Sequence, residues 1–479
     1  MTALEYDLET LAREANEKPF DVVVVGGGSA GLTVARTLFE QGLTVAVLEA
    51  GPAPFLTHIT NTDLRFTRGL TRNLRDANLY RPDLAGGGSF GTNYGCLGGR
   101  GLFWNGAAPR YSYEDLGGWP IDPPDLDTDY LWAEGQFRVG TSMGRTPLAR
   151  RMLDRLAEAG LPGEPGPFAA DIDDLYVGRL GSGIASGLCI FFRACGEAVA
   201  AGKVKVSVNS LVDRLLLEGG KVSGVSVGHP GGPTVEVRAR AVVLAGGGIE
   251  SIKLAVLSDV PDPGGRIGRG VQEHLFYACN GKCAALYDPA QRDSAIIYRR
   301  APSQEAHQWE VHVPGNRLFA IDDGTPWQPD DSPPYQLMMR SFAATEKTDD
   351  NYIEARPGAL GSSQVHFQYT AADKATMARI VADAARMAEA LDMVPADAPA
   401  VDSLERFRPP GSSYHEAGGL DMGTNPGNGV TDVDGRFFAV PNLIAADAAA
   451  FPRIGATNPH LTIVAVARRK ARALAQVLS

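Results

Sequence analysis

His415 is one of eight histidines and lies in the stretch GSSYHEAGGLDMG, residues 411–423. Glycines and small residues surround it, and neither a helical nor a strand period runs through the stretch. Such a histidine can hydrogen-bond within a loop, bind a metal or act as a general base, because its reference pKa of about 6.5 leaves neutral imidazole at pH 7. No metal site is expected, since no second histidine at helical spacing and no carboxylate pattern accompanies it.

Asn458 is a second polar candidate and precedes Pro459 at the start of the last segment. Asparagine followed by proline is typical of a helix cap and first turn, so the pattern predicts a helix that begins here. His460 can either approach a site or pack in the first turn, and the sequence does not decide between these roles. The expected helix has apolar residues at three- or four-residue spacing, at Leu461, Val464, Ala467, Ala471, Leu474 and Leu478.

The role of His415 and Asn458 depends on the ligand that the N-terminal part of the chain binds. The relevant stretch is FDVVVVGGGSAGLTVARTLFEQGLTVAVLEAG, residues 20–51. Val22–Val25 predict a strand buried on both faces of a parallel sheet. A G-x-G-x-x-G pattern follows, formed by Gly26, Gly28 and Gly31. These glycines permit a tight turn, a close approach of the backbone to a pyrophosphate, and helix–strand packing, respectively. Glu49 ends the second apolar run and is placed to accept hydrogen bonds from a ribose. The unit predicts a dinucleotide site and leaves NAD or FAD open.

The composition limits the kinds of partner that the protein can have. The chain has 479 residues, 44% hydrophobic and 21% charged, which suits two or three globular domains. Its net charge of −11 disfavours nucleic acid as a partner. No apolar run reaches the roughly 18 to 20 residues of a membrane span, and the first residues are acidic rather than leader-like. Five cysteines match neither a disulfide framework nor a zinc pattern, so we expect a cytoplasmic location.

The elements that must position the site come from separate parts of the chain. Nine glycines in Gly86–Tyr111 predict a backbone lying against a flat or extended ligand. An antiparallel meander then leads into a buried strand at Ala241–Ala245. The middle, about Tyr277–Ala400, carries more aromatics and an amphipathic helix near Ala372–Leu391, which indicates a second domain with an antiparallel sheet. We expect a nucleotide domain in three parts (1–140, 191–275, 406–479), an insertion or cap (141–190) and a substrate-binding domain (276–405).

Several stretches, in this order, resemble the glucose–methanol–choline (GMC) oxidoreductases, flavoenzymes that oxidise alcohols with FAD. They are VVVVGGGSAGLTVA…VLEAG, CLGGRGLFWNGAAPR, ARAVVLAGGGIESIKL, GRIGRGVQEHL, YHEAGGLDMG and PNLIAADAAAFPRIGATNPHLTIVAVA. Within the family, GGRGLFWNGAAPR and LGGWPID are most similar to the pyranose-oxidase and glycoside 3-oxidase branch. The resemblance implies an α/β fold: a Rossmann-like FAD-binding domain of the GMC and p-hydroxybenzoate-hydroxylase type, with an α+β substrate domain built on an antiparallel sheet.

The resemblance also implies roles for residues. His415 and Asn458 match the catalytic pair, while His274 is expected to pack. Where related pyranose oxidases often carry a flavin-linked histidine, this chain has Phe103, so FAD is expected to bind without a covalent link. Arg100 departs from the small residue usual after the paired glycines. The expected FAD-binding residues are Gly26, Gly28, Ser29, Ala30, Gly31, Glu49, Ala50, Asn105, Gly106, Val212, Ala245, Gly246, Asp447, Ala448, Asn458 and Pro459.

The function implied is oxidation of a CH–OH group on a sugar, glycoside or related polyol or secondary metabolite. His415 would take the hydroxyl proton, N5 of FAD would take the hydride, and Asn458 would orient the substrate oxygen. O2, a quinone or a carrier protein would accept the electrons. Two alternatives remain: a hydroxynitrile-lyase-like enzyme that keeps FAD without using its redox chemistry, and a non-catalytic nucleotide-fold binding protein.

Overall fold

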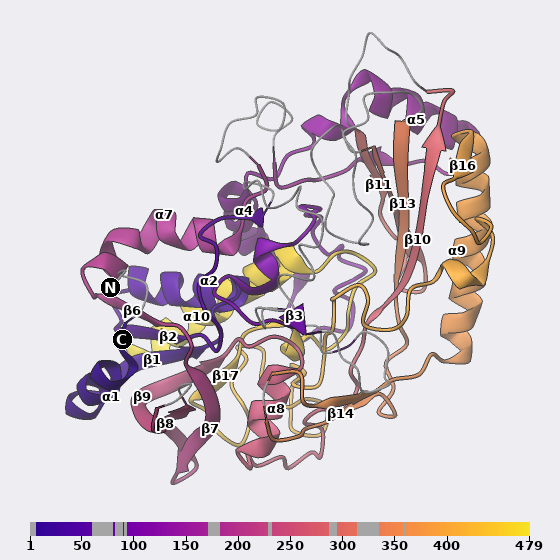
Figure 1. Ribbon diagram of the computed structural model, residues 1–479. Helices are drawn as coiled ribbons and strands as arrows, with labels where there is room; N and C mark the ends of the chain where they lie inside the picture. Colours follow the sequence, from indigo (N-terminus) through magenta and orange to yellow (C-terminus); the bar gives the residue numbers. More distant parts are fainter. Residues whose placement is uncertain are drawn as a thin grey trace.

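The computed structural model describes residues 6–59, 80–81, 90, 93–170, 183–228, 232–286, 295–313, 335–358 and 360–479. Part of the glycine-rich segment Gly86–Tyr111 and part of the expected insertion therefore lie outside the described residues. Two large sheets dominate the fold and lie beside each other in Figure 1. Among the described residues, no helix is both long and apolar enough to cross a bilayer.

The first sheet is mostly parallel and has the order β6-β2-β1-β9-β8-β7, with β17 also beside β9. Strands β6, β2, β1, β9 and β17 run parallel, and β7, β8 and β9 form an antiparallel meander. The expected strand at Ala241–Ala245 is the end of β9 rather than a separate element. The strands are β1 (Phe20–Val25), β2 (Val45–Leu48), β6 (Val204–Ser207), β7 (Leu211–Glu218), β8 (Lys221–Gly228), β9 (Val235–Leu244) and β17 (Leu443–Ala445).

Both faces of this sheet are covered, which explains the run of valines in β1. Val22 and Val24 pack with the helices α2 (Ser29–Glu40), α7 (Gly187–Ala200) and α10 (His460–Leu478). Val23 points to the other face and joins a different cluster, to which α1 (Leu8–Glu17) contributes Leu8 and Leu11. Alternate residues of a strand point to opposite faces, so a strand buried on both sides needs apolar residues throughout.

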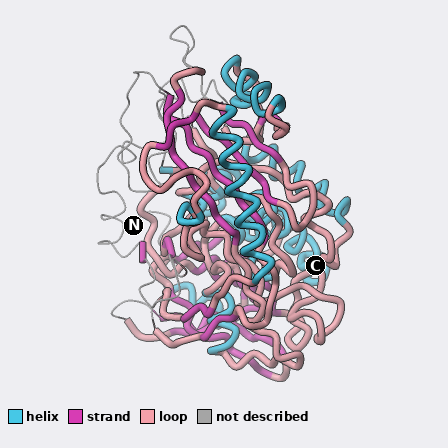
Figure 2. The backbone as a smooth tube through the Cα atoms, turned by 90° about the vertical axis from the view of Figure 1, so that its right-hand side faces the viewer, coloured by secondary structure: helices cyan, strands magenta, loops and turns pink. Residues whose placement is uncertain are grey.

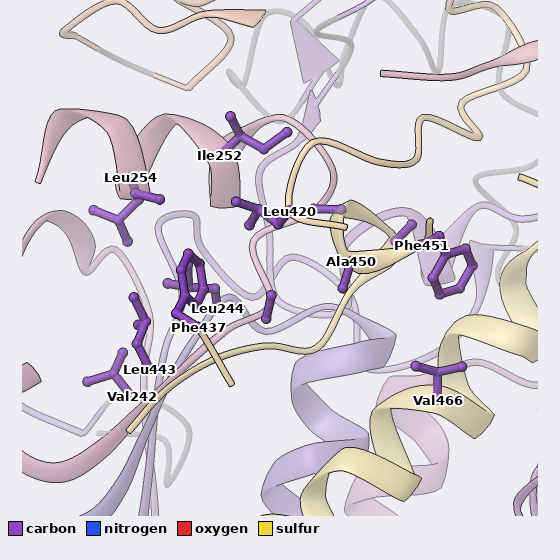
Figure 3. Close-up of a cluster of buried hydrophobic side chains, with 14 of the residues drawn as sticks. Val242, Leu244, Ile252, Leu254, Leu420, Phe437, Leu443, Ala450, Phe451 and Val466 are labelled. Carbon is purple, nitrogen blue, oxygen red and sulfur yellow. The ribbon is translucent and has the colours of Figure 1, made fainter. Parts of the chain in front are cut away.

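The larger cluster joins distant parts of the chain. Figure 3 shows Leu244 of β9, Leu443 of β17 and Ile252 of α8 (Glu250–Leu257) together with side chains from the last sixty residues. The C-terminal segment is therefore packed into the first sheet. The labelled partners from that segment include Leu420, Phe437, Ala450, Phe451 and Val466.

The second sheet is antiparallel, with the order β16-β10-β13-β12-β11-β5. The helices α9 (Ala371–Ala390) and α5 (Pro147–Glu158) cover one face, and α9 runs along the strands in Figure 2. Alternate residues of β10, such as Leu275 and Tyr277, join that covered face, whereas Phe276 points to the opposite one. The strands are β5 (Glu164–Pro165), β10 (His274–Cys283), β11 (Ala295–Arg299), β12 (His307–Val313), β13 (Tyr335–Ala344) and β16 (Met393–Pro395).

Shorter elements connect these layers. The remaining helices are α4 (Asp127–Phe137) and the 3₁₀ turns η3 (Gly99–Leu102), η4 (Pro123–Leu126), η5 (Ser142–Gly144), η6 (Leu404–Arg406) and η7 (Ala448–Ala450). Two small ribbons pair β3 (Tyr80–Arg81) with β4 (Asn93–Tyr94) and β14 (Tyr352–Glu354) with β15 (Gln364–His366).

The last helix begins one residue later than expected. α10 starts at His460 with Pro459 as its N-cap, and the Pro459 carbonyl accepts from the Ile463 amide at 2.8 Å. The prediction that Asn458 caps this helix is wrong, because its side-chain oxygen bonds to Gln308 instead, at 3.0 Å. The side chain of Asn458 is therefore directed to the second sheet.

Candidate active site

A first cavity, of about 280 Å³, lies at the carboxyl ends of the central parallel strands. Ligands of open parallel sheets bind at this edge. Ser29, Ala30 and Gly31 belong to α2 and do not line it. The expected cofactor-binding residues that do line it are Gly26, Gly28, Glu49, Ala50, Val212, Ala245 and Gly246.

The three glycines of the fingerprint meet different neighbours. A Cβ on Gly31 would lie 2.0 Å from the carbonyl oxygen of Gly26, so the third glycine is required by packing. Gly26 has φ +102, a conformation that favours glycine. A Cβ on Gly28 would meet no protein atom within 4 Å. Gly28 therefore leaves space that faces the cavity, which is what close approach of a phosphate requires.

Glu49 is anchored at the rim of this cavity. Its Oε2 accepts from the Gly27 amide at 2.8 Å, and its Oε1 accepts from the Gly51 amide at 2.9 Å. Burial raises the pKa of this carboxyl. Each carboxylate oxygen can accept a further hydrogen bond, so the group remains able to receive one from a ligand hydroxyl.

A second cavity, of about 210 Å³, lies between the first sheet's C-terminal segment and the free face of the second sheet. His415 and Asn458 both line it, together with the expected cofactor-binding residues Asn105, Ala448 and Pro459. Gly106 does not line it, and a Cβ at Gly106 would lie 2.6 Å from the Phe168 ring. The two cavities adjoin at Arg100, which lines both.

Arg100 also holds the histidine loop. Its guanidinium pairs with the Glu416 carboxylate, to which Nη2 donates at 3.1 Å, and Nη1 donates to the Tyr414 carbonyl at 2.8 Å. The sequence marks this arginine only as an unusual residue after paired glycines. The structure shows that it fastens residues 414–416 to η3 and places a positive charge where the cavities meet.

His415 is held by two neighbours from the start of β10. Its backbone amide donates to Oε2 of Glu273 at 3.4 Å, and its ring Nδ1 lies 2.9 Å from Nδ1 of His274. Burial, followed by the charges of His274, Arg100 and His460, lowers the pKa of His415 well below 6.5. Within the described part of the chain, Nε2 of His415 has no hydrogen-bond partner.

Asn458 is held by Gln308 of β12, a fully buried residue. Nε2 of Gln308 donates to Oδ1 of Asn458 at 3.0 Å, and the Thr457 hydroxyl donates to Oε1 of Gln308. This chain of bonds engages the oxygen of the Asn458 amide and leaves its NH₂ group as the end available to the cavity. The sequence shows no signal for Gln308, because the register that brings β12 to residue 458 is a tertiary property.

Asp447, another expected cofactor-binding residue, lies beside the cavities without lining them. Its carboxylate accepts from the Gly247 amide at 2.8 Å, the Ser251 hydroxyl at 2.6 Å and the Ala449 amide at 3.0 Å. It therefore ties η7 to the start of α8. Its direct contact with a cofactor stays a prediction.

Two buried polar atoms flank the boundary between the cavities. Oγ of Ser29 and Nε2 of His460 have no hydrogen-bond partner among the described residues. Both side chains lie near Gly101, where a Cβ would be 2.3 Å from Oγ of Ser29 and 3.5 Å from Cε1 of His460. The His460 ring stacks on Trp104 with centroids 4.0 Å apart. Buried polar groups are costly without partners, so this boundary suits a ligand that carries hydrogen-bonding atoms.

Glu273, His274 and His415 bring ligand atoms within 4.8 Å of one another. No spacing in the sequence indicates this grouping, because the residues come from two segments far apart in the chain. The atoms of this group bond mainly to protein. Oε1 of Glu273 accepts from the His274 amide at 2.7 Å and from the Ser413 hydroxyl, and Nε2 of His274 lies 2.8 Å from the Gly455 carbonyl.

Three protein families match parts of the chain. Residues 348–467 match the family described as GMC oxidoreductase. Residues 21–85 match the family described as FAD dependent oxidoreductase, and residues 168–279 match an FAD binding domain. The first match contains the His415 loop and Asn458, and the other two contain most of the residues around the first cavity.

Curated relatives span nearly the full length. The chain is 26% identical to a C-glycoside 3-oxidase of Microbacterium trichothecenolyticum, over 96% of this chain and 97% of the relative. It is 26% identical to a C-glycoside 3-oxidase of Arthrobacter globiformis, over 96% and 95%. It is also 26% identical to a paromamine 6'-oxidase of Streptomyces fradiae, over 96% and 92%.

Proposed function

From the premise that this chain carries the C-terminal domain of the GMC oxidoreductases together with FAD-binding domains, we propose that it is an FAD-dependent enzyme that oxidises a CH–OH group of a sugar or glycoside. Relatives of similar length are named for oxidation of a C-glycoside and of paromamine. The observation that carries the proposal is that His415 and Asn458 line the same cavity, with Nε2 of His415 and the NH₂ group of Asn458 outside their hydrogen bonds to His274 and Gln308.

The two adjoining cavities suit the two ends of FAD. In this proposal the adenosine end lies against Glu49 and Val212 in the first cavity, and the ring system lies against Asn105 in the second. The space at Gly28 and the unpartnered polar atoms between the cavities support this placement. Phe103 lines the second cavity and has no nucleophilic atom, so FAD is held without a covalent bond there. The fold is then of the GMC and p-hydroxybenzoate-hydroxylase type, with the domain division expected from the sequence.

FAD, when bound, supplies the acceptor for the hydride that leaves the substrate carbon. His415 removes the hydroxyl proton at Nε2, which is the nitrogen not engaged by His274. Asn458 donates from its NH₂ group to the same substrate oxygen and holds the carbinol in place as negative charge develops on that oxygen. O2, a quinone or a carrier protein accepts the two electrons afterwards.

The walls of the second cavity also suit a carbohydrate. The rings of Phe276 and Phe342 stack 4.8 Å apart on the free face of the second sheet. Asn280, Arg340 and Arg408 line the same cavity. Binding pockets typically combine apolar surface with a few placed hydrogen-bonding groups, and a sugar ring offers both kinds of surface.

Anaerobic mixing of the purified flavoprotein with methyl β-D-glucopyranoside, a C-glycoside, paromamine and benzyl alcohol tests the function. We expect at least one of the sugar derivatives to bleach the yellow flavin, and benzyl alcohol to leave it oxidised. A hydroxynitrile-lyase-like enzyme or a binding protein predicts that none of these compounds reduces the flavin. Bleaching by benzyl alcohol alone would contradict the carbohydrate assignment.

A cytoplasmic location stays part of the proposal, and all five cysteines are free thiols.

The rate of flavin reduction should depend on pH in a way that reports His415. Its lowered pKa keeps the imidazole neutral, and therefore able to accept a proton, below pH 6.5 as well as above it. Glu273, whose pKa burial raises to about 8, stays protonated over most of a range from about pH 7.5 to pH 5.5. We expect stopped-flow measurements in that range to show no inflection at the reference value of about 6.5, with loss of rate only at lower pH. An inflection near 6.5 in that range contradicts the proposed environment of His415.

A further inference from the structure

His274 is the first residue of β10 and lies between a backbone carbonyl and the proposed base. Its side chain is 1% exposed. One ring nitrogen, Nε2, lies 2.8 Å from the carbonyl oxygen of Gly455, and the other, Nδ1, lies 2.9 Å from Nδ1 of His415. Both nitrogens of His274 are therefore used in hydrogen bonds, and both partners belong to the C-terminal segment.

The Gly455 carbonyl determines which atom donates in each of these two hydrogen bonds. A carbonyl oxygen only accepts hydrogen bonds, so Nε2 of His274 carries the proton. A neutral imidazole has one ring proton, which leaves a lone pair on Nδ1 of His274. The contact between the two Nδ1 atoms needs one proton, and it must come from His415. Burial lowers the pKa of His274 to about 4, in keeping with the neutral form.

We propose that His274 is a positioning residue that fixes the tautomer of His415, with the proton on Nδ1 and a lone pair on Nε2. The tautomer itself does not depend on the proposed function. The inference rests on that function only in its consequence for catalysis, which is that Nε2 meets the substrate hydroxyl. When a hydroxyl proton moves to Nε2, both nitrogens of His415 carry protons and Nδ1–H continues to donate to His274. The proton from the substrate is thus held on one atom, and no other donor or acceptor is consumed.

The surroundings keep the two rings in this relation. Their centroids are 4.9 Å apart with an interplanar angle of 81°, and the Phe342 ring lies 5.5 Å from His274 and 5.8 Å from His415. The His274 amide donates to Glu273 at 2.7 Å. Glu310 acts on the charge of His274, and Arg100 and His460 act on that of His415. Glu273 bonds to the backbone amides of both residues and is itself influenced by Glu416.

The tautomer can be read directly in the flavoprotein by ¹⁵N–¹H correlation spectra with ¹⁵N-labelled histidine. The His415 signals are assigned from their disappearance in His415→Ala. We expect wild-type His415 to show a protonated Nδ1 and an unprotonated Nε2. A protonated Nε2 in the neutral ring, or an imidazolium at pH 7.5, overturns the inference. This readout does not need a substrate, so it decides the tautomer even when no sugar reduces the flavin.

Two substitutions then test whether His274 is the cause. His274→Gln keeps an N–H for Gly455 and an oxygen acceptor for Nδ1 of His415, so it should keep the tautomer and reduce flavin within about tenfold of wild type. His274→Phe keeps a ring without either group, so it should lose the single tautomer and slow reduction roughly hundredfold or more, with little change in the apparent substrate affinity. His366→Phe, on β15, is the matched control, because His366 contacts Tyr352 and Glu354 and lines neither cavity.

The outcomes separate the two proposals. A wild-type tautomer and reduction rate in a folded His274→Phe variant overturn the positioning role. A His274→Gln variant as impaired as His274→Phe also contradicts it, since the loss then follows from packing rather than from hydrogen bonding. If the spectra show Nδ1–H but no sugar bleaches wild-type flavin, the positioning of His415 stands and the proposed function fails.

Discussion

Replacing His415 with alanine should lower the rate of flavin reduction by a reactive glycoside about 10²- to 10⁴-fold while leaving the protein yellow. The factor is what a positioned general base contributes to proton transfer. FAD should be retained because His415 does not line the first cavity, where the adenosine end is proposed to bind, and its ring bonds only to His274 among the described residues. Anaerobic stopped-flow absorbance gives the rate, and the ratio of flavin to protein absorbance gives the FAD content.

Asn458→Ala is the companion variant. It removes a donor to the substrate oxygen rather than the base, so we expect a smaller loss of about 10²- to 10³-fold. His366→Ala serves as the control for removal of an imidazole and should behave as wild type. Wild-type reduction in His415→Ala would reject the base assignment, and loss of flavin from His415→Ala would show that the residue holds FAD instead.

Gly28→Val should give a folded protein that binds no FAD. The backbone at Gly28 is extended, with φ −76 and ψ −176, which any residue adopts. A Cβ there meets no protein atom within 4 Å, so a side chain at this position starts in open space. The added side chain fills space at the edge of the first cavity, where the phosphates are expected to approach the backbone. We expect a colourless protein with the melting temperature of wild-type apoprotein, and no quenching of flavin fluorescence on titration with FAD.

Gly135→Val, on the exposed side of α4, is the matched control, since a Cβ there also meets no protein atom within 4 Å. It should purify with wild-type flavin content. Gly31→Ala is unsuitable as a test, because the new Cβ would lie 2.0 Å from the Gly26 carbonyl oxygen and would disturb folding itself. Full FAD binding by Gly28→Val would contradict the placement of the cofactor in the first cavity.

The local patterns predicted much of the fold. The valines of β1, the glycines after it and the spacing in α10 depend on neighbours within one strand–turn–helix unit, and the structure has these elements. The meander and the helix near 372–391 were also predicted, the helix to within one residue at each end. The meander and the helices are indicated by a period of 2 or 3.6 residues. β1 is indicated by its unbroken run of β-branched residues, and the turn after it by its glycines.

The supports of the candidate site could not be predicted. His274 and Gln308 lie on strands of the second sheet, and their partners, Gly455, Thr457 and Asn458, lie more than a hundred residues away. A strand pattern indicates which residues share a face and carries no information about which distant segment packs there. For this reason we expected His274 only to pack, and its hydrogen bonds could not be predicted. The cap predicted at Asn458 failed because tertiary bonds to Gln308 displaced the local preference.

A crystal structure of the protein with FAD tests the central claim most directly: two adjoining cavities receive one cofactor, and two polar side chains meet the reactive part of its ring. We predict density for the adenosine end beside Glu49 and Val212, and for the ring system between Asn105 and the side chains of His415 and Asn458. Nε2 of His415 and the amide nitrogen of Asn458 should face N5 of the ring across space for one carbinol group. A ring bound outside the second cavity, or His415 turned away from N5, would contradict the account.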